Sequence, residues 1–94
     1  MTPIFGKLTH CVYILYSEQD DHLYTGYSAC LRDRLTAHFE GKVESTAARR
    51  PLRLIHVEYY LAETDARRRE QYLKSTRGKR ALQLMCRDSL AEVC

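Results

Sequence analysis

Two short apolar runs near the start of the chain predict a pair of neighbouring strands. Residues 11–17 are β-branched and aromatic, and a polar stretch rich in turn-forming residues, 18–22, separates them from a second run, 23–27. Runs joined by so short a polar link are typical of a β-hairpin. This hairpin places Tyr13 and Tyr24 on adjacent strands, either directly opposed or one diagonal step apart.

An amphipathic helix is predicted after the hairpin. Its stripe consists of residues spaced at i, i+3, i+4 and i+7, namely Leu31, Arg34, Leu35 and His38. The pattern covers 31–40, with Ser28 as the expected N-terminal cap and Gly41 as the end of the helix. Residues 42–51 are polar and basic, and they predict a loop.

The next segment, 52–61, predicts a third strand because apolar and polar positions alternate along it. One face would carry Leu52, Leu54, His56, Glu58 and Tyr60, and the other Arg53, Ile55, Val57, Tyr59 and Leu61.

Two further helices are predicted in the last third of the chain. Thr64 is a good N-cap for a helix over 65–75, Gly78 interrupts the chain, and 79–87 is typical of a last short helix. The resulting order β-β-α-β-α-α indicates an α/β fold of the α+β type, in which helices pack against a three-stranded sheet.

Composition narrows the class of protein. The 94 residues are 45 % apolar and 29 % charged, as in average soluble domains, which argues against a membrane span or a disordered chain. One domain is expected over 10–87, with a lead-in at 1–9 and a tail at 88–94. No signal sequence opens the chain and none of the four cysteines forms a Cys-x-x-Cys pair, so reduced thiols and a cytoplasmic location are expected.

Positive charge is concentrated in patches. Lys and Arg exceed Asp and Glu by only 15 − 12 = +3. The segment 67–80, however, holds seven basic residues and a single acidic one, Glu70, and a second basic cluster lies at 49–53. Patches of this kind favour a polyanionic partner more than the net charge does.

Three charged or titratable residues fall on apolar stripes. Arg34 and His38 share the stripe of the first helix, and Glu70 falls on the stripe of Ala66 and Leu73 in the next. A charge in such a place must be paired, metal-bound or chemically useful. Pairing of Glu70 with Arg34 or Lys74 is therefore one interpretation. The corresponding interpretation of His38 is a hydrogen-bonded histidine at the margin of the helix. For the tyrosines it is packing alone, with no role in chemistry.

The combination of these residues resembles the GIY-YIG nuclease superfamily. The resemblance is carried by Val12-Tyr13-Ile14, Tyr24-Thr25-Gly26, Arg34, His38, and Glu70 before Tyr72-Leu73-Lys74-Ser75. It covers roughly residues 10–85 and is closest to the small stand-alone members of the UvrC-like and URI-type branch. The sequence departs from the pattern in four places: Val12-Tyr13-Ile14 stands where the name has Gly-Ile-Tyr, Thr25 where it has Ile, Leu82 where many members carry Asn, and Tyr27 where the excision-repair enzyme has Lys.

The resemblance implies a central three-stranded antiparallel sheet and metal-dependent hydrolysis of DNA phosphodiesters. Structure-selective cleavage linked to repair or recombination is one form of this activity. Glu70 would be the sole carboxylate ligand of one Mg²⁺ or Mn²⁺, bound weakly without substrate. Arg34 would hold the scissile phosphate. Tyr13 would take the proton of the attacking water, Tyr24 would orient phosphate or water, and His38 would orient the phosphate or assist Tyr13.

DNA is the expected partner, and no membrane partner is expected. The residues expected to bind nucleic acid are Arg49, Arg50, Arg67, Arg68, Lys74 and Lys79. A protein partner that supplies substrate selectivity is left open. The alternative function is a catalytically weak nucleic-acid-binding or partner-dependent module with the same fold.

Overall fold

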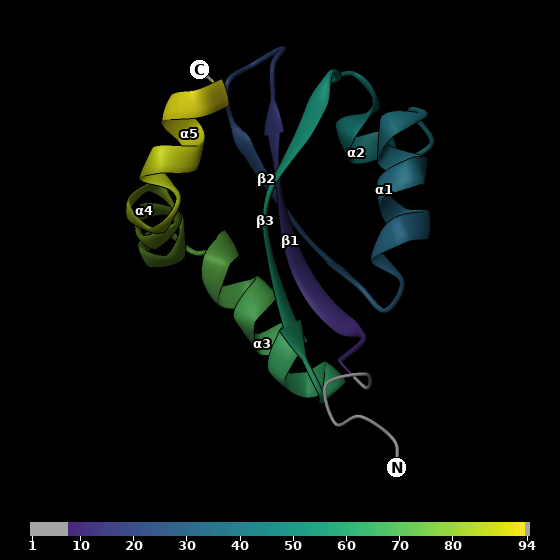
Figure 1. Cartoon of the computed structure of the whole chain (residues 1–94), viewed down its shortest axis with the longest axis vertical. Helices are drawn as coiled ribbons and strands as arrows, with labels where there is room; N and C mark the ends of the chain where they lie inside the picture. The colour runs from purple at the N-terminus through teal and green to yellow at the C-terminus, as the bar shows by residue number, and fades with distance from the viewer. Residues whose placement is uncertain (1–7, 94) are drawn as a thin grey trace.

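The computed structural model describes residues 8–93, which form a three-stranded antiparallel sheet with helices on both faces (Figure 1). The strands are β1 (His10–Ser17), β2 (Leu23–Ser28) and β3 (Leu52–Tyr60), arranged in the order β2-β1-β3. Because β1 lies in the centre and is covered on both faces, its side chains are buried, as expected for a run that is apolar at nearly every position. The predicted sheet is confirmed.

The register of the hairpin decides how the two tyrosines meet. Tyr13 pairs with Gly26, and Leu15 pairs with Tyr24. Tyr13 and Tyr24 are therefore diagonal neighbours on one face of the sheet, which is the second of the two predicted arrangements.

The helices form two layers. The helices α1 (Leu31–Phe39) and α2 (Glu44–Ala47) cover one face, and α3 (Glu63–Lys74), α4 (Thr76–Met85) and α5 (Arg87–Val93) cover the other (Figure 1). Each layer closes its own apolar cluster against β1. The cluster under α3 and α4 includes Val12, Ile14, Ala66, Leu73 and Leu82; the cluster under α1 includes Cys11, Tyr13, Leu15 and Leu52.

Two short helices were absent from the predicted order β-β-α-β-α-α. The helix α2 lies within 42–51, the segment predicted as a loop, and α5 begins at the end of the last predicted helix. The division into lead-in, domain and tail stays a prediction. Leu90 of α5, within the expected tail, packs against the core, while residues 1–7 and 94 lie outside the described residues.

The two predicted N-caps were each wrong by two residues. The N-cap of α1 is Cys30, whose backbone N–H donates to the hydroxyl of Ser28 at 2.9 Å. The N-cap of α3 is Ala62, so Thr64 lies in the first turn of the helix. Both predicted residues are good capping types, but the helices begin at positions that tertiary packing determines.

Gly78 does not interrupt the chain. It lies in the first turn of α4, where its backbone N–H donates to the hydroxyl of the N-cap residue, Ser75, at 3.1 Å. A Cβ atom at Gly78 would lie 1.9 Å from the carbonyl oxygen of Tyr72. The glycine therefore allows α4 to pack closely against the end of α3.

A β-bulge shifts the predicted faces of β3. The pairing of β1 with β3 changes register between Ile14 and Leu15, which leaves Ile55 as the extra residue. Consequently Leu52 and Val57, predicted on opposite faces, pack on the same side, that of α1. In the part of the chain that the structure describes, no helix is long and apolar enough to cross a bilayer.

Candidate active site

The hydroxyl of Tyr13 is the centre of a hydrogen-bonded group formed by β1 and α1. It lies 2.7 Å from Nε2 of His38, and Nε of Arg34 donates to it at 3.4 Å. Tyr13 and His38 are fully buried, whereas Arg34 is exposed. The i, i+4 spacing of Arg34 and His38 on α1 places both side chains above the strand that carries Tyr13. Three of the five predicted site residues therefore meet at the hydroxyl oxygen of Tyr13.

The glycine of the Tyr24-Thr25-Gly26 motif makes room for this phenol. A Cβ atom at Gly26 would lie 2.4 Å from both Cζ and the hydroxyl oxygen of Tyr13. The ring of Tyr13 therefore lies directly over the backbone of β2. Only glycine leaves the hydroxyl in place to meet His38.

Tyr24 completes the aromatic part of the site. Its ring centroid lies 5.2 Å from that of His38 in a T-shaped arrangement and 6.4 Å from that of Tyr13. The hydrogen bond to Tyr13, and beyond it the hydroxyl of Tyr24, raise the pKa of Arg34. The guanidinium is thus the fixed positive charge of this group.

Thr46 is a residue of the site that the sequence pattern did not indicate. Its hydroxyl lies 2.7 Å from Nδ1 of His38. It also donates a long hydrogen bond, 3.5 Å, to the carbonyl oxygen of Val43. Thr46 is fully buried and belongs to α2. The short helix, which the sequence predicted as loop, positions this hydroxyl behind the imidazole.

One placement of the protons gives every donor in this chain of contacts a partner. Thr46 donates to the Val43 carbonyl and accepts from Nδ1–H of His38, which leaves Nε2 free to accept from the Tyr13 hydroxyl. The opposite tautomer would point Nε2–H at the oxygen of Tyr13, which already accepts from Arg34, and would leave the buried phenol proton with no acceptor in these contacts. Such a proton is costly to bury. The tautomer protonated at Nδ1 is therefore favoured.

Burial keeps both central residues neutral. It raises the pKa of Tyr13 to about 12, although the hydrogen bond from Arg34 acts in the opposite direction. Burial, and then the charge of Arg34, lowers the pKa of His38. At neutral pH the site therefore holds a neutral phenol that donates to a neutral imidazole.

Glu70 lies on the other side of the sheet, on α3. It is half-buried on the stripe of the buried residues Ala66 and Leu73, as predicted, and Nζ of Lys74 lies 3.0 Å from its carboxylate. Of the two partners considered for Glu70, the structure has Lys74 and not Arg34. Within residues 8–93, no hydrogen bond or ion pair joins Glu70 to the group around Tyr13.

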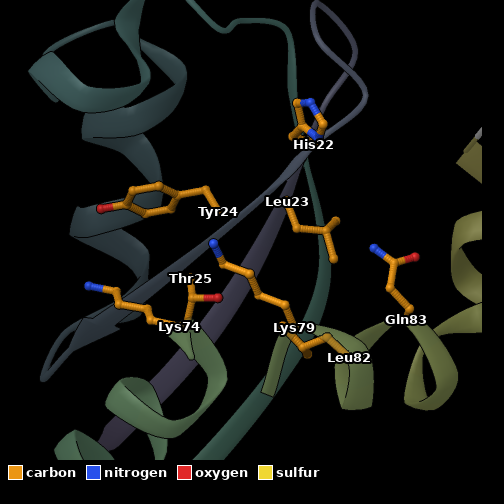
Figure 2. Close-up of a pocket in the computed structure, with 8 residues that line it drawn as sticks. All are labelled: His22, Leu23, Tyr24, Thr25, Lys74, Lys79, Leu82 and Gln83. Carbon is orange, nitrogen blue, oxygen red and sulfur yellow. The ribbon is translucent and has the colours of Figure 1, made fainter. Parts of the chain in front are cut away.

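One groove is lined by a residue from each part of the site. Tyr24 of β2 and Lys74 of α3 line the same groove, so the ion pair of Glu70 lies beside the edge strand that carries Tyr24 (Figure 2). Leu82, at the position where many members of the resembled superfamily carry Asn, is buried and contributes to the groove's apolar floor.

Glu70 stands alone as a candidate metal ligand. The described part of the chain contains no group of three or more His, Cys, Asp or Glu side chains that could hold an ion. A half-buried carboxylate with one ammonium partner can still supply one oxygen to a hard divalent cation, whose other ligands would be water and substrate oxygens. The residues present thus fit a weakly held ion that depends on substrate.

Most of the residues expected to bind nucleic acid have partners of their own. Arg49 pairs with Asp20, Arg67 with Glu63, Arg68 with Asp65 and Lys74 with Glu70, at 2.7, 2.8, 2.9 and 3.0 Å respectively. Arg50 donates to the carbonyl of Ala47 at 3.0 Å, and Lys79 has no ion pair with another residue of 8–93. The pairs of Arg67 and Arg68 are exposed, and exposed pairs are weak, so a polyanion can compete for these two arginines.

Comparison with known proteins identifies the family. A family model described as the GIY-YIG catalytic domain matches residues 9–83. The chain belongs to the GIY-YIG family. This is a nuclease family, and the match confirms the resemblance seen in the sequence.

Relatives of this GIY-YIG chain share most of its length. A UPF0213 protein of Clostridium perfringens is 35 % identical over 82 residues, which are 86 % of this chain and 87 % of that protein. A UPF0213 protein of Staphylococcus haemolyticus is 34 % identical over 77 residues, 81 % of this chain and 93 % of that protein. The solution NMR structure of a UPF0213 protein from Bacillus halodurans is similar at a TM-score of 0.52 and 34 % identity, and the match covers 81 % of this chain and 83 % of that one.

Proposed function

We propose that this protein is a metal-dependent endonuclease that hydrolyses phosphodiester bonds in DNA. The observation that carries the proposal is the hydroxyl of Tyr13, held between His38 and Arg34. A proton acceptor and an exposed guanidinium on the same phenol supply two of the functions that the hydrolysis of a phosphodiester by water requires.

Arg34 supplies the positive charge for the phosphate. Its Nε donates to Tyr13, and the other nitrogens of the exposed guanidinium can hold the non-bridging oxygens of the scissile phosphate. This contact places the phosphorus atom beside the phenol and stabilises the charge that grows on the phosphate in the transition state.

Tyr13 and His38 together accept the proton of the attacking water. As the water oxygen bonds to phosphorus, its proton passes to the oxygen of Tyr13, and the phenol proton passes to Nε2 of His38 over 2.7 Å. His38 becomes an imidazolium, the bond to the leaving oxygen breaks, and solvent protonates that oxygen. Because the phenol never has to ionise beforehand, its raised pKa is no obstacle to the reaction.

Glu70 is the residue that would hold the metal. A divalent ion bound there would act as a Lewis acid on the phosphate and its leaving oxygen. The carboxylate is oriented by its place on the apolar stripe of α3, and Tyr24, in the groove beside it, would orient phosphate or water.

A catalytically weak DNA-binding module is the second candidate. The ion pair between Glu70 and Lys74 favours it, because an ammonium group occupies one oxygen of the only carboxylate proposed to bind metal. Such a module would bind DNA with an affinity that falls steeply as salt rises, but would not cut it.

The discriminating experiment is cleavage across a panel of DNA structures. Branched, flapped, single-stranded and linear DNA are incubated with the protein, with and without Mg²⁺ or Mn²⁺, beside folded Glu70→Ala and Arg34→Ala. The endonuclease cuts only with metal and loses activity in both variants. Equal cutting by wild type and Glu70→Ala would reveal a contaminating nuclease, and salt-sensitive binding without cutting would favour the module. The panel also tests whether cleavage is structure-selective, as expected of a repair or recombination function.

A further inference from the structure

The groove between β2 and the helices α3 and α4 has the character of a binding site for a nucleic-acid strand. It has a volume of about 470 Å³, within the range of about 300–1,000 Å³ that ligand-sized sites occupy. Tyr24, a residue of the candidate active site, forms part of its wall (Figure 2). We propose that this groove holds the DNA strand on one side of the cleaved bond, with its phosphates on Lys79 and Lys74. The inference rests on the proposed endonuclease function and deepens it.

The charge of the groove fits a polyanion. Among the described residues, its lining includes two lysines and His22 but no carboxylate. Lys79 has no ion pair with another described residue, and Lys74 shares its ammonium only with Glu70. Both lysines extend from the helices toward β2 (Figure 2). Positive charges on one concave wall concentrate an anionic chain more strongly than scattered surface charges do.

The floor of the groove fits the less polar part of a nucleotide. Leu23 of β2 and the buried Leu82 of α4 are apolar, and Gln83 adds a side chain that can both donate and accept hydrogen bonds. An apolar floor below cationic walls matches a chain in which anionic phosphates alternate with sugars and bases. A small free anion would gain nothing from this floor.

The position of the groove gives the strand its path. β2 is an edge strand of the sheet that residues 8–93 form, so no further strand of these residues lies beyond it. The ring of Tyr24 contacts His38 on the α1 side, while Thr25, the next residue, lines the groove on the α4 side. A strand that crosses the edge of β2 therefore runs from Arg34 and Tyr13, past Tyr24, to Lys74 and Lys79 on the far side.

Binding measured without cleavage tests the inference. The affinity for a fluorescent DNA is followed by anisotropy in EDTA over a series of salt concentrations. Lys79→Gln is compared with Arg80→Gln, a matched control one residue along α4 that is also exposed but does not line the groove. Lys79→Gln should weaken binding about 3- to 10-fold more than the control and reduce the salt slope by about 1. Lys79→Arg should restore most of the affinity.

The outcomes separate the two proposals. Equal losses of DNA affinity in Lys79→Gln and Arg80→Gln would overturn the proposal that the groove binds DNA, because the lysine would then act only through net charge. If wild type cleaves DNA and the two losses are equal, the proposed endonuclease function is supported and the proposed binding of DNA in the groove is ruled out. If wild type does not cleave DNA, and Lys79→Gln weakens binding while Arg80→Gln does not, the binding of DNA in the groove is supported and the endonuclease function is ruled out. In a cleaving enzyme, Lys79→Gln should also raise KM, whereas Arg80→Gln should leave it unchanged.

Discussion

The hydroxyl of Thr46 lies 2.7 Å from Nδ1 of His38, and both side chains are fully buried. Together with the hydrogen bond from the Thr46 hydroxyl to the Val43 carbonyl, this contact favours the tautomer in which Nε2 accepts the proton of Tyr13. Thr46 is buried behind the imidazole, so it acts through His38 as a positioning residue.

Thr46→Val tests the tautomer. Valine has the shape of threonine but leaves Nδ1–H without an acceptor, so the second tautomer gains population and Nε2 stops accepting. Cleavage should fall about 10- to 100-fold, and the fold should be retained with a loss of roughly 1–3 kcal/mol in stability. Nitrogen NMR of the His38 ring reports the tautomer directly. Thr46→Ser should keep both the tautomer and the activity; a valine variant with unchanged ring signals would contradict the assignment.

Gly26→Ala tests the packing of the phenol over β2. The added methyl would lie 2.4 Å from the hydroxyl end of Tyr13, a buried ring with no space to yield. The hydroxyl should move away from His38, cleavage should be lost, and stability should fall by about 1–3 kcal/mol. Thermal unfolding and cleavage rates measure the two effects. Wild-type cleavage in this variant would show that the hydroxyl position is unimportant.

The dependence of cleavage on pH distinguishes a proton relay from a preformed tyrosinate. His38 accepts a proton only when neutral, and its pKa is lowered, so activity should be lost only as pH falls below the ordinary histidine range near 6.5. The pKa of Tyr13 is raised to about 12, so the relay predicts a flat profile from neutral pH to about 9.5. A tyrosinate base would instead give a rate that rises about tenfold per pH unit over this range. Initial rates at saturating metal measure the profile.

Lys74→Gln tests whether the lysine competes with metal for Glu70. Its ammonium lies 3.0 Å from the carboxylate, and its removal should tighten the binding of Mn²⁺ a few-fold in the absence of DNA. Electron paramagnetic resonance of free Mn²⁺ measures this affinity. Lys79→Gln is the control, because it removes the same charge from the same groove without an ion pair to Glu70. Equal effects of the two substitutions would rule out a specific competition.

The sequence predicted those parts of the site that depend on local periodicity. The hairpin pattern made Tyr13 and Tyr24 neighbours, and helical spacing placed Arg34 and His38 together. The same spacing put Glu70 on a stripe with buried residues, which the structure confirms. These relationships follow from repeats of about 2 and 3.6 residues, which a single chain displays directly.

The features that were missed depend on contacts between distant segments. Thr46 lies in a helix of four residues, too short to show a periodic pattern, and its partner is eight positions earlier. The bulge at Ile55 has no local signal, and Gly78 resembles a chain break until the close approach of Tyr72 is known. The acidic partners that neutralise Arg67 and Arg68 lie just outside the basic run, in the first turns of α3. Sequence spacing alone therefore overestimated the free positive charge.

The rate of DNA cleavage by Tyr13→Phe under single-turnover conditions with added Mg²⁺ decides whether the Tyr13 hydroxyl takes part in the hydrolysis. The substitution removes one oxygen atom, the one held between His38 and Arg34, and leaves the ring over Gly26. We predict a folded protein that binds DNA as tightly as wild type but cleaves it at least about 100-fold more slowly. Cleavage at the wild-type rate would rule out this mechanism, because the hydrolysis would then not depend on this hydroxyl.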